Sequence, residues 1–183
     1  MFDLPKNGIR LRAFRQSDLD DILALHNDAE VALYATSGFA VPQGETRKES
    51  YKNNAEKAEL FCVAETKPFE SSASDKPEFI GIAALWPDQE RGQRHSRYSI
   101  TLNKKFWGRG YGSEITKFMV DYAFRNLNMH RISLGVIQGN DRALSIYKNC
   151  GFVLEGTQRK SNWIDGGWRD VYLMGMLIED WVD

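Results

Sequence analysis

A glycine-rich turn at residues 107–113 (WGRGYGS) most restricts the fold, because it is expected to join a strand to a long helix. Glycines there allow positive φ angles and let a ligand approach the backbone without a Cβ in the way. The N–H groups of the first helical turn point outward, and the helix dipole favours an anion beside them. Arg109 adds a positive charge. This segment alone predicts either an anion site at a helix N-terminus or an ordinary glycine-rich turn.

The elements around this turn predict a single α+β (mixed α/β) domain over residues 1–183. Apolar runs and their periodicity predict about six to seven strands and about four helices. The expected strands cover residues 8–14, 60–65, 79–86, 98–103, 131–137, 152–159 and 171–177. The expected helices cover residues 17–26 and 45–58, a long segment after residue 113, and residues 140–150. Polar loops are expected at residues 34–44, 66–78 and 160–170.

The composition restricts the partners and the compartment. The net charge of −1 at pH 7 shows no basic excess, which argues against a nucleic acid or an anionic membrane as the partner. No apolar run approaches the roughly 18 residues that span a bilayer, and no signal peptide is readable. Cys62 and Cys150 lack metal-type spacing, so we expect buried free thiols, no metal site and a cytoplasmic location.

Three kinds of anion site use such a turn. A Walker loop ends in Gly-Lys-Ser/Thr, whereas Gly112, Ser113 and Glu114 supply no lysine. A Rossmann fingerprint requires glycine at position 113 and an acidic residue closing the next strand, and the sequence has neither. The third kind is the pyrophosphate site of acetyl-CoA, where the loop is followed by a helix, a strand and a second helix. The order of the expected elements fits this third kind.

Residues 98–177 resemble the GNAT superfamily of acetyl-CoA-dependent N-acetyltransferases. The family's phosphate loop, Gln/Arg-x-x-Gly-x-Gly/Ala, is matched by residues 107–112, with Trp107 at the Gln/Arg position. A second motif, Asn-x-x-Ala-x-x-x-Tyr-x-x-x-Gly-Phe, is matched by residues 140–152. Trp107 and the segment 151–172 are similar to the branch that contains ribosomal-protein alanine and spermidine acetyltransferases.

The resemblance implies a central mixed, largely antiparallel, splayed sheet that binds acetyl-CoA as the acetyl donor. It places Asn140 at the pantetheine arm, and backbone N–H groups near Leu102 at the point where two parallel strands separate. It places the hydroxyl of Tyr147 near the cofactor sulfur, as the acid that protonates the departing thiolate. The residues of the turn that it assigns to the cofactor are Trp107, Gly108, Arg109, Gly110, Tyr111, Gly112 and Ser113. Periodicity alone would make Asn140 a helix cap and Tyr147 a core residue.

The general base stays open at the level of sequence. Direct transfer needs an acceptor for the amine proton, and neither cysteine has an adjacent histidine that would favour an acyl-enzyme. The candidates, each of which also suits a solvated surface position, are Asp88, Glu90, His95, Glu155 and Asp165. We single out Asp165 as catalytic, because Trp163 and Trp168 flank it and could form a partly dried pocket that raises its pKa.

The acceptor is expected to be an amine-bearing small molecule or peptide, recognised by the loops at residues 34–42 and 160–170. A polyamine would call for clustered carboxylates, whereas the second loop mixes acidic and basic side chains. We therefore favour an α-amine on a peptide, an amino acid or a small metabolite over a polyamine. A catalytically weak acetyl-CoA sensor is the alternative of another class, and a homodimer stays open as the assembly.

Overall fold

The structure, a computed structural model, describes residues 1–35, 41–67, 76–87 and 91–181. These residues form one eight-stranded sheet in the order β1-β2-β3-β4-β5-β6-β8-β7. The strands are β1 (Phe2–Asp3), β2 (Ile9–Arg12), β3 (Leu60–Thr66), β4 (Phe79–Pro87), β5 (His95–Leu102), β6 (Arg131–Ile137), β7 (Val153–Ile164) and β8 (Gly167–Leu177). Neighbouring strands are antiparallel except β5 and β6, which run parallel. The predicted mixed, largely antiparallel sheet is confirmed.

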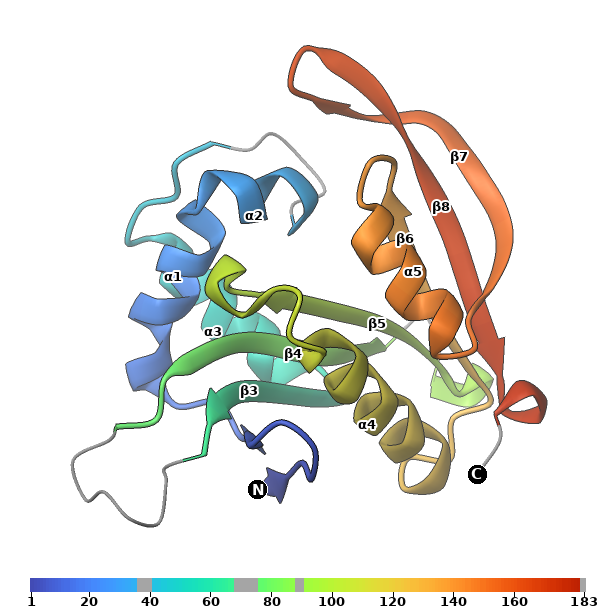
Figure 1. The fold of residues 1–183 in the computed structure, drawn as a ribbon, viewed down its shortest axis with the longest axis horizontal. Coiled ribbons are helices and arrows are strands. Elements are labelled where there is room, and N and C mark those ends of the chain that lie inside the picture. The colour runs from blue at the N-terminus through green and yellow to red at the C-terminus, as the bar shows by residue number, and fades with distance from the viewer. Residues whose placement is uncertain (36–40, 68–75, 88–90, 182–183) are drawn as a thin grey trace.

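Helices cover the sheet. Those in the described ranges are α1 (Leu19–Asn27), α2 (Ala29–Ala35), α3 (Arg47–Lys57), α4 (Tyr111–Arg125) and α5 (Asp141–Asn149). Figure 1 shows α4 and α5 on the near side of the sheet. None of the helices in the described part of the chain is long and apolar enough to cross a membrane.

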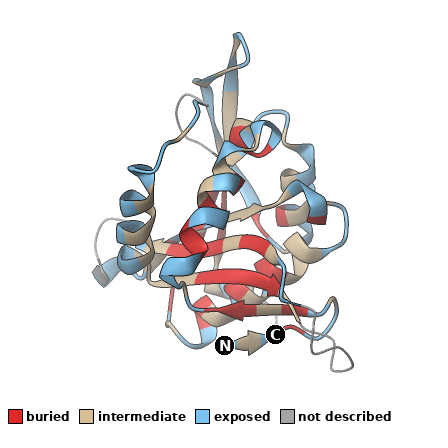
Figure 2. Ribbon diagram, turned by 90° about the vertical axis from the view of Figure 1, so that its left-hand side faces the viewer, coloured by how far each residue is buried: buried red, intermediate tan, exposed pale blue. Residues whose placement is uncertain are grey.

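The core lies between α4 and the middle strands. Ile115, Met119 and Ala123 recur every four residues along α4 and are fully buried, so this helix packs one continuous stripe against the sheet. In β6, Ile132, Leu134 and Val136 are buried while the two residues between them are not, as expected for a strand with one face on the core. Figure 2 shows the buried positions gathered in these central strands.

The sheet opens between β5 and β6. These strands are paired only from His95↔Arg131 to Arg97↔Ser133. Beyond that point β5 continues along β4 as far as Leu102, and β6 continues along β8. The sheet therefore divides into two arms, β1–β5 and β6–β8–β7, which diverge in Figure 1. This is the splay that the resemblance implies.

The predicted loop at residues 160–170 is wrong. β7 runs to Ile164 and β8 begins at Gly167, so the turn between them consists of Asp165 and Gly166 alone. Both turn residues have positive φ angles, +48° and +72°. Asp-Gly favours this conformation, because its twist matches that of the flanking strands. The polar residues of this segment therefore lie in strands of an exposed hairpin.

The sequence patterns do not predict α2 or the short β1. The carboxylate of Asp28 accepts hydrogen bonds from the N–H groups of Glu30 at 3.0 Å and Val31 at 3.3 Å, which caps α2. At seven residues the helix is too short for its periodicity to be read reliably. Residues 36–40 and 68–75, which belong to the predicted loops at 34–44 and 66–78, lie outside the described residues.

Candidate active site

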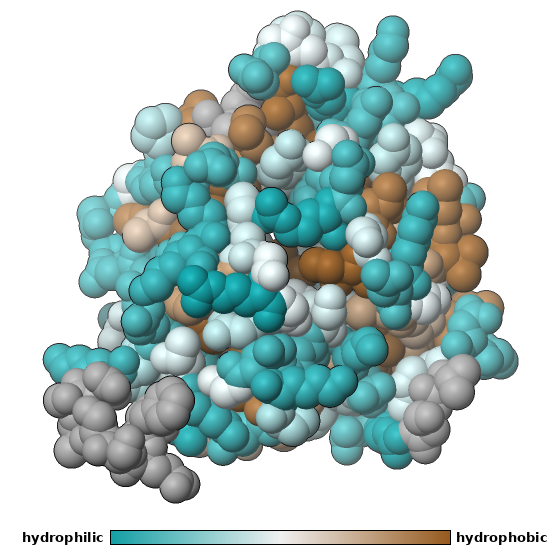
Figure 3. Space-filling model, in the orientation of Figure 1, coloured by the Kyte–Doolittle hydropathy of each residue, from teal (hydrophilic) through white to brown (hydrophobic). Residues whose placement is uncertain are grey.

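A cleft of about 840 Å³ lies where the two arms separate. β4, β5 and α4 line one side of it, and β6, α5, β7 and β8 line the other. α2 borders the cleft as well, and the hydroxyl of Tyr34 donates to the carbonyl of Gly139 at 3.5 Å. This contact links α2 to the turn before α5. Figure 3, in the orientation of Figure 1, shows apolar residues near the centre of the surface that faces the viewer, with polar residues around them.

The glycine-rich turn borders the cleft through Trp107 and Gly112. Gly108 and Gly110 have φ angles of +76° and +80°, and Gly110 is the N-cap of α4. The N–H of Glu114 donates to Gly110 at 3.1 Å, so the N–H groups at 111–113 precede the first intrahelical bond. A Cβ added at Gly108 would meet no atom within 4 Å. Within the described residues these N–H groups are left without a backbone partner, and the space beside Gly108 is open, which suits a pyrophosphate.

Two arginines border the turn, each held against an aromatic ring. The guanidinium of Arg142, on α5, lies 4.5 Å from the centroid of Trp107. That of Arg109 lies 5.7 Å from the centroid of Phe106. The indole of Trp107 also donates to the carbonyl of Leu102 at 2.9 Å. Trp107 thus ties the turn to the end of β5 and supports a cation beside the anion site.

The backbone of β5 supplies donors to the cleft. The N–H of Asn103 donates to the carbonyl of Ile80 in β4 at 2.8 Å. Because N–H directions alternate along a strand, those of Ile100 and Leu102 point away from β4, to the side where β6 has separated. The carbonyl of Leu102, which points the same way, is the one that accepts from Trp107. An extended ligand arm could pair with this wall.

Tyr147 is buried in the core, as its position in the helical periodicity predicts, and it also lines the cleft. Its ring is 8% exposed and makes edge contacts with Tyr98 and Phe152, at centroid distances of 6.2 and 5.8 Å. Burial, and secondarily Cys150, raises the pKa of its hydroxyl well above the usual range. The hydroxyl of Tyr98 is engaged by Thr116 Oγ1 at 3.1 Å. Within the described residues no hydrogen bond reaches the Tyr147 hydroxyl, so it stays available to a ligand.

Asn140 is the N-cap of α5, as its residue type predicts. Its Oδ1 accepts a hydrogen bond from the N–H of Ala143 at 3.2 Å. The residue also lines the cleft, so its cap position places it beside the ligand space. A contact between Asn140 and the pantetheine arm stays a prediction.

The structure does not bring Asp165 to the cleft. It is exposed at the tip of the β7–β8 hairpin, where its positive φ fits the turn. Trp163 and Trp168 pack on each other across the hairpin, with centroids 5.4 Å apart, and both are about half exposed. The expected partly dried pocket around Asp165 is therefore wrong, because the two rings form a cross-strand pair above an ordinary turn.

The structure describes two of the other base candidates, Glu155 and His95. Asp88 and Glu90 lie outside the described residues. Glu155 forms an ion pair with Arg131 on the exposed surface, and the ring of His95 is 2.8 Å from Ser133 Oγ. Neither Glu155 nor His95 is among the residues that line the cleft.

The cleft contains residues that sequence reasoning does not identify. They come from separate strands and include Trp86, Arg97, Ser133 and Gln158. Tyr34 and Asn162 also line the cleft, and they belong to the segments 34–42 and 160–170 that are predicted to recognise the acceptor. The available signal is strand alternation: if even-numbered residues of β5 face α4, the odd-numbered ones face the opposite side. Only the register between strands shows which of these residues meet.

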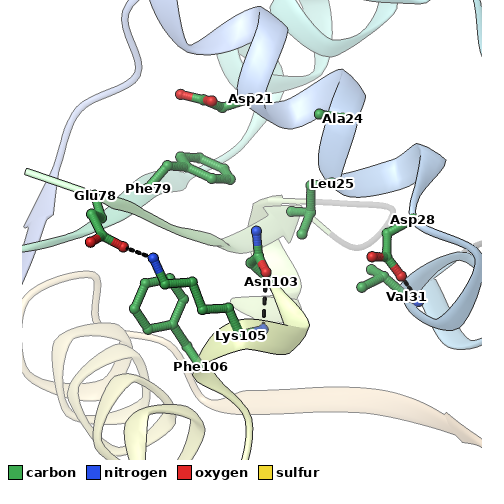
Figure 4. Close-up of a pocket in the computed structure, with 10 residues that line it drawn as sticks. All are labelled: Asp21, Ala24, Leu25, Asp28, Val31, Glu78, Phe79, Asn103, Lys105 and Phe106. Atoms are coloured by element: carbon green, nitrogen blue, oxygen red, sulfur yellow. Dashed lines mark hydrogen bonds and ion pairs between the residues drawn. The ribbon is translucent and has the colours of Figure 1, made fainter.

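A second cavity, of about 410 Å³, lies between α1, α2 and the start of β4 (Figure 4). It contains no residue of either sequence motif. Two of its carboxylates are engaged by lysines: Glu78 by Lys105, and Asp28 by Lys104 at 3.3 Å. We therefore take the larger cleft as the candidate active site.

The two cysteines are free thiols. Cys62 is buried, which raises its pKa to about 11, and the half-buried Cys150 has its Sγ 3.9 Å from the carbonyl of Ser113. In the described part of the chain, no group of three or more His, Cys, Asp or Glu side chains is arranged to hold a metal ion.

Comparison with known proteins gives the family context. Residues 9–153 match the family described as an acetyltransferase (GNAT) domain. The crystal structure of spermidine N-acetyltransferase from Vibrio cholerae with CoA and spermine has a TM-score of 0.81 at 26% identity, over 96% of this chain and 98% of that one. The L-amino acid N-acetyltransferase AaaT of Escherichia coli is 31% identical over 77% of this chain and 99% of its own length. The putative ribosomal N-acetyltransferase YdaF of Bacillus subtilis is 24% identical over 48% of each chain. The names of these relatives point to three different acceptors.

Proposed function

Because the chain belongs to the GNAT acetyltransferase family, we propose that it transfers the acetyl group of acetyl-CoA directly to the α-amine of an amino acid, a peptide or a small metabolite. Membership confirms the resemblance drawn from the two motifs, together with N-acetyltransferase activity and acetyl-CoA as the donor. The proposal concerns the acceptor and the residues that act on it.

The donor is held along one wall of the cleft. Its pyrophosphate lies on the N–H groups of residues 111–113, with Arg109 and Arg142 beside it. Its pantetheine arm pairs with the N–H groups of Ile100 and Leu102, as a strand would. Support comes from the direction of these donors and from the open cleft in front of them.

A Gly110→Ala variant is expected to bind acetyl-CoA about tenfold more weakly. Gly110 has a φ of +80°, where a Cβ costs roughly 1–2 kcal/mol, so the turn relaxes and its N–H donors lose alignment. Calorimetric titration with CoA measures the effect. Gly44→Ala is the matched control, because Gly44 has open space around it and is not among the glycines with positive φ. An unchanged affinity in a folded Gly110→Ala protein would contradict this placement.

The transfer step uses Tyr147 as the acid. The amine nitrogen forms a bond to the acetyl carbon, the C–S bond breaks, and the departing thiolate takes the hydroxyl proton of Tyr147. The hydroxyl is protonated at neutral pH, as any tyrosine is, and burial raises its pKa further, which keeps it protonated but makes it a weaker acid. The amine loses its proton to water in the open cleft, and water returns a proton to the Tyr147 oxygen, which restores the hydroxyl for the next turnover. Cleft-facing N–H groups of β5 polarise the thioester carbonyl.

The charge of the cleft supports an α-amine over a polyamine. Among the described residues that line it, Asp141 is the only carboxylate, and it lies in the first turn of α5, near the phosphate site. A polyamine carries several positive charges, which clustered carboxylates would have to neutralise. This single observation carries the choice of acceptor class.

The test is a panel of acceptors offered to the purified protein with acetyl-CoA. Thiol release and the mass of the product are followed for amino acids, short peptides and spermidine. We expect the kcat/KM of the best α-amine to exceed that of spermidine by at least about tenfold. This ratio corresponds to a difference of about 1.4 kcal/mol in transition-state binding. Binding of acetyl-CoA without acetylation of any amine would contradict the proposed function and favour a sensor.

A polyamine acceptor is the second candidate. The specific observation that favours it is the fold match, over nearly the whole chain, with the spermidine N-acetyltransferase of Vibrio cholerae. The panel separates the two candidates, since a polyamine enzyme would turn over spermidine fastest.

A further inference from the structure

Arg97 lies at the apex of the cleft. It is the last residue of β5 that pairs with β6, opposite Ser133, and it lines the space where the strands part. At about 3.3 Å per residue, it is roughly 17 Å along the strand from Leu102, beyond which the phosphate turn begins. Arg97 is therefore too far from the turn to serve as a phosphate ligand.

The side chain of Arg97 faces the side of the sheet opposite Tyr147. Tyr98 points to α4 and α5, where it contacts Thr116 and Tyr147, so strand alternation directs Arg97 to the other face. Its two partners in the sheet, Trp86 on β4 and Ser133 on β6, are uncharged. The indole of Trp86 donates to Ser99 Oγ at 2.7 Å. An acceptor that enters from this face would meet the thioester with Arg97 beside it.

The guanidinium of Arg97 has no counter-ion within the described ranges: no ion pair or hydrogen bond joins it to another described side chain. The second cleft arginine, Arg142, is held on Trp107 at the phosphate end. A guanidinium is always charged and presents a planar fork of donors that matches a carboxylate. At the apex it therefore suits an anionic group on the acceptor.

We propose that Arg97 binds the carboxylate of the acceptor, which makes free amino acids, rather than peptide N-termini or polyamines, the preferred substrates. This inference rests on the proposed function and narrows its acceptor class. In an amino acid the carboxylate stabilises the neighbouring ammonium. Pairing that carboxylate with Arg97 cancels the effect and favours the neutral amine that attacks. The same positive charge repels a polyamine.

The test compares each L-amino acid with its own carboxamide, which keeps the amine and side chain and removes the negative charge. For the wild-type protein and Arg97→Gln, kcat/KM is measured for both members of each pair. For each protein, the kcat/KM of the acid is divided by that of the amide. The acid and the amide differ in the reactivity of their amines, but this difference is the same for both proteins and cancels when the two ratios are compared. We expect Arg97→Gln to lower this ratio roughly 10- to 100-fold, mainly through the KM of the acid, as loss of a charged hydrogen-bonded pair predicts. The KM for acetyl-CoA stays the same.

Two further variants sharpen the result. Arg97→Lys keeps the charge and should retain part of the preference for the acid; it also serves if Arg97→Gln folds poorly. Arg142→Gln removes the other cleft arginine, and should raise the KM for acetyl-CoA with an unchanged acid-to-amide ratio. Equal ratios in the wild type and Arg97→Gln, or spermidine as the best acceptor, would overturn the inference. Failure of the proposed function looks different, because the wild type would then acetylate no amine.

Discussion

A Leu102→Pro variant is expected to lose roughly 10- to 100-fold in kcat/KM for acetyl-CoA while it keeps its fold. Loss of one N–H that pairs with the pantetheine arm leaves the arm's acceptor group without its partner, at a cost of about 1–3 kcal/mol. Proline at this position removes the N–H that points into the cleft. It leaves the sheet intact, because the neighbouring β4–β5 bond is made by Asn103 to Ile80. The carbonyl of residue 102 can still accept from Trp107.

The matched control is Leu102→Ala, which shortens the side chain and keeps the N–H. The difference between the two variants isolates the backbone donor from the packing of the leucine near Gly112. Steady-state kinetics and CoA titration are measured on both, with circular dichroism to verify the fold. If proline and alanine at residue 102 give the same kinetics, the β5 wall does not hold the donor in the way we propose.

The features predictable from sequence are those whose chemistry is local. The turn at residues 107–113, the cap at Asn140 and the apolar stripe of α4 each depend on residues within one or two helical turns. The left-handed backbone at Gly110 and the hydrogen bond from Ala143 to Asn140 are what those residue types favour. Two such local motifs, in the order in which the GNAT superfamily has them, carry the resemblance that implies acetyl-CoA as the donor.

The acceptor side could not be predicted in the same way, because it is assembled by register. Arg97 meets Ser133 only because β5 and β6 are paired at that point and nowhere beyond it. A shift of one residue would turn Arg97 toward α4 instead. The Asp165 prediction is wrong for a related reason: Asp-Gly forms a tight hairpin turn between the two tryptophans, so their rings pack on each other and do not enclose a pocket.

The second large effect is expected from Tyr147→Phe, which should lower kcat about 100-fold with little change in acetyl-CoA affinity. The thiolate of CoA is a fair leaving group, so loss of the acid falls at the lower end of the range for general acid catalysis. The phenylalanine ring keeps the contacts with Tyr98 and Phe152, so the cleft keeps its shape. Tyr98→Phe is the matched control, because it removes a hydroxyl that bonds to Thr116. Loss of that bond lowers the stability of the fold by about 1 kcal/mol. The folded enzyme keeps its acid, so kcat should fall less than about threefold.

The pH dependence of kcat follows from the protonation state of the Tyr147 hydroxyl. The protonated hydroxyl is the active form, and because burial raises the pKa of Tyr147, that form persists above the ordinary tyrosine pKa of about 10. The wild-type kcat should therefore show no descending limb due to this tyrosine between about pH 6 and pH 9, and Tyr147→Phe should be slower by the same factor throughout that range. A Tyr147→Phe protein as fast as the wild type would remove the acid role, and the thiolate would then have to leave unprotonated.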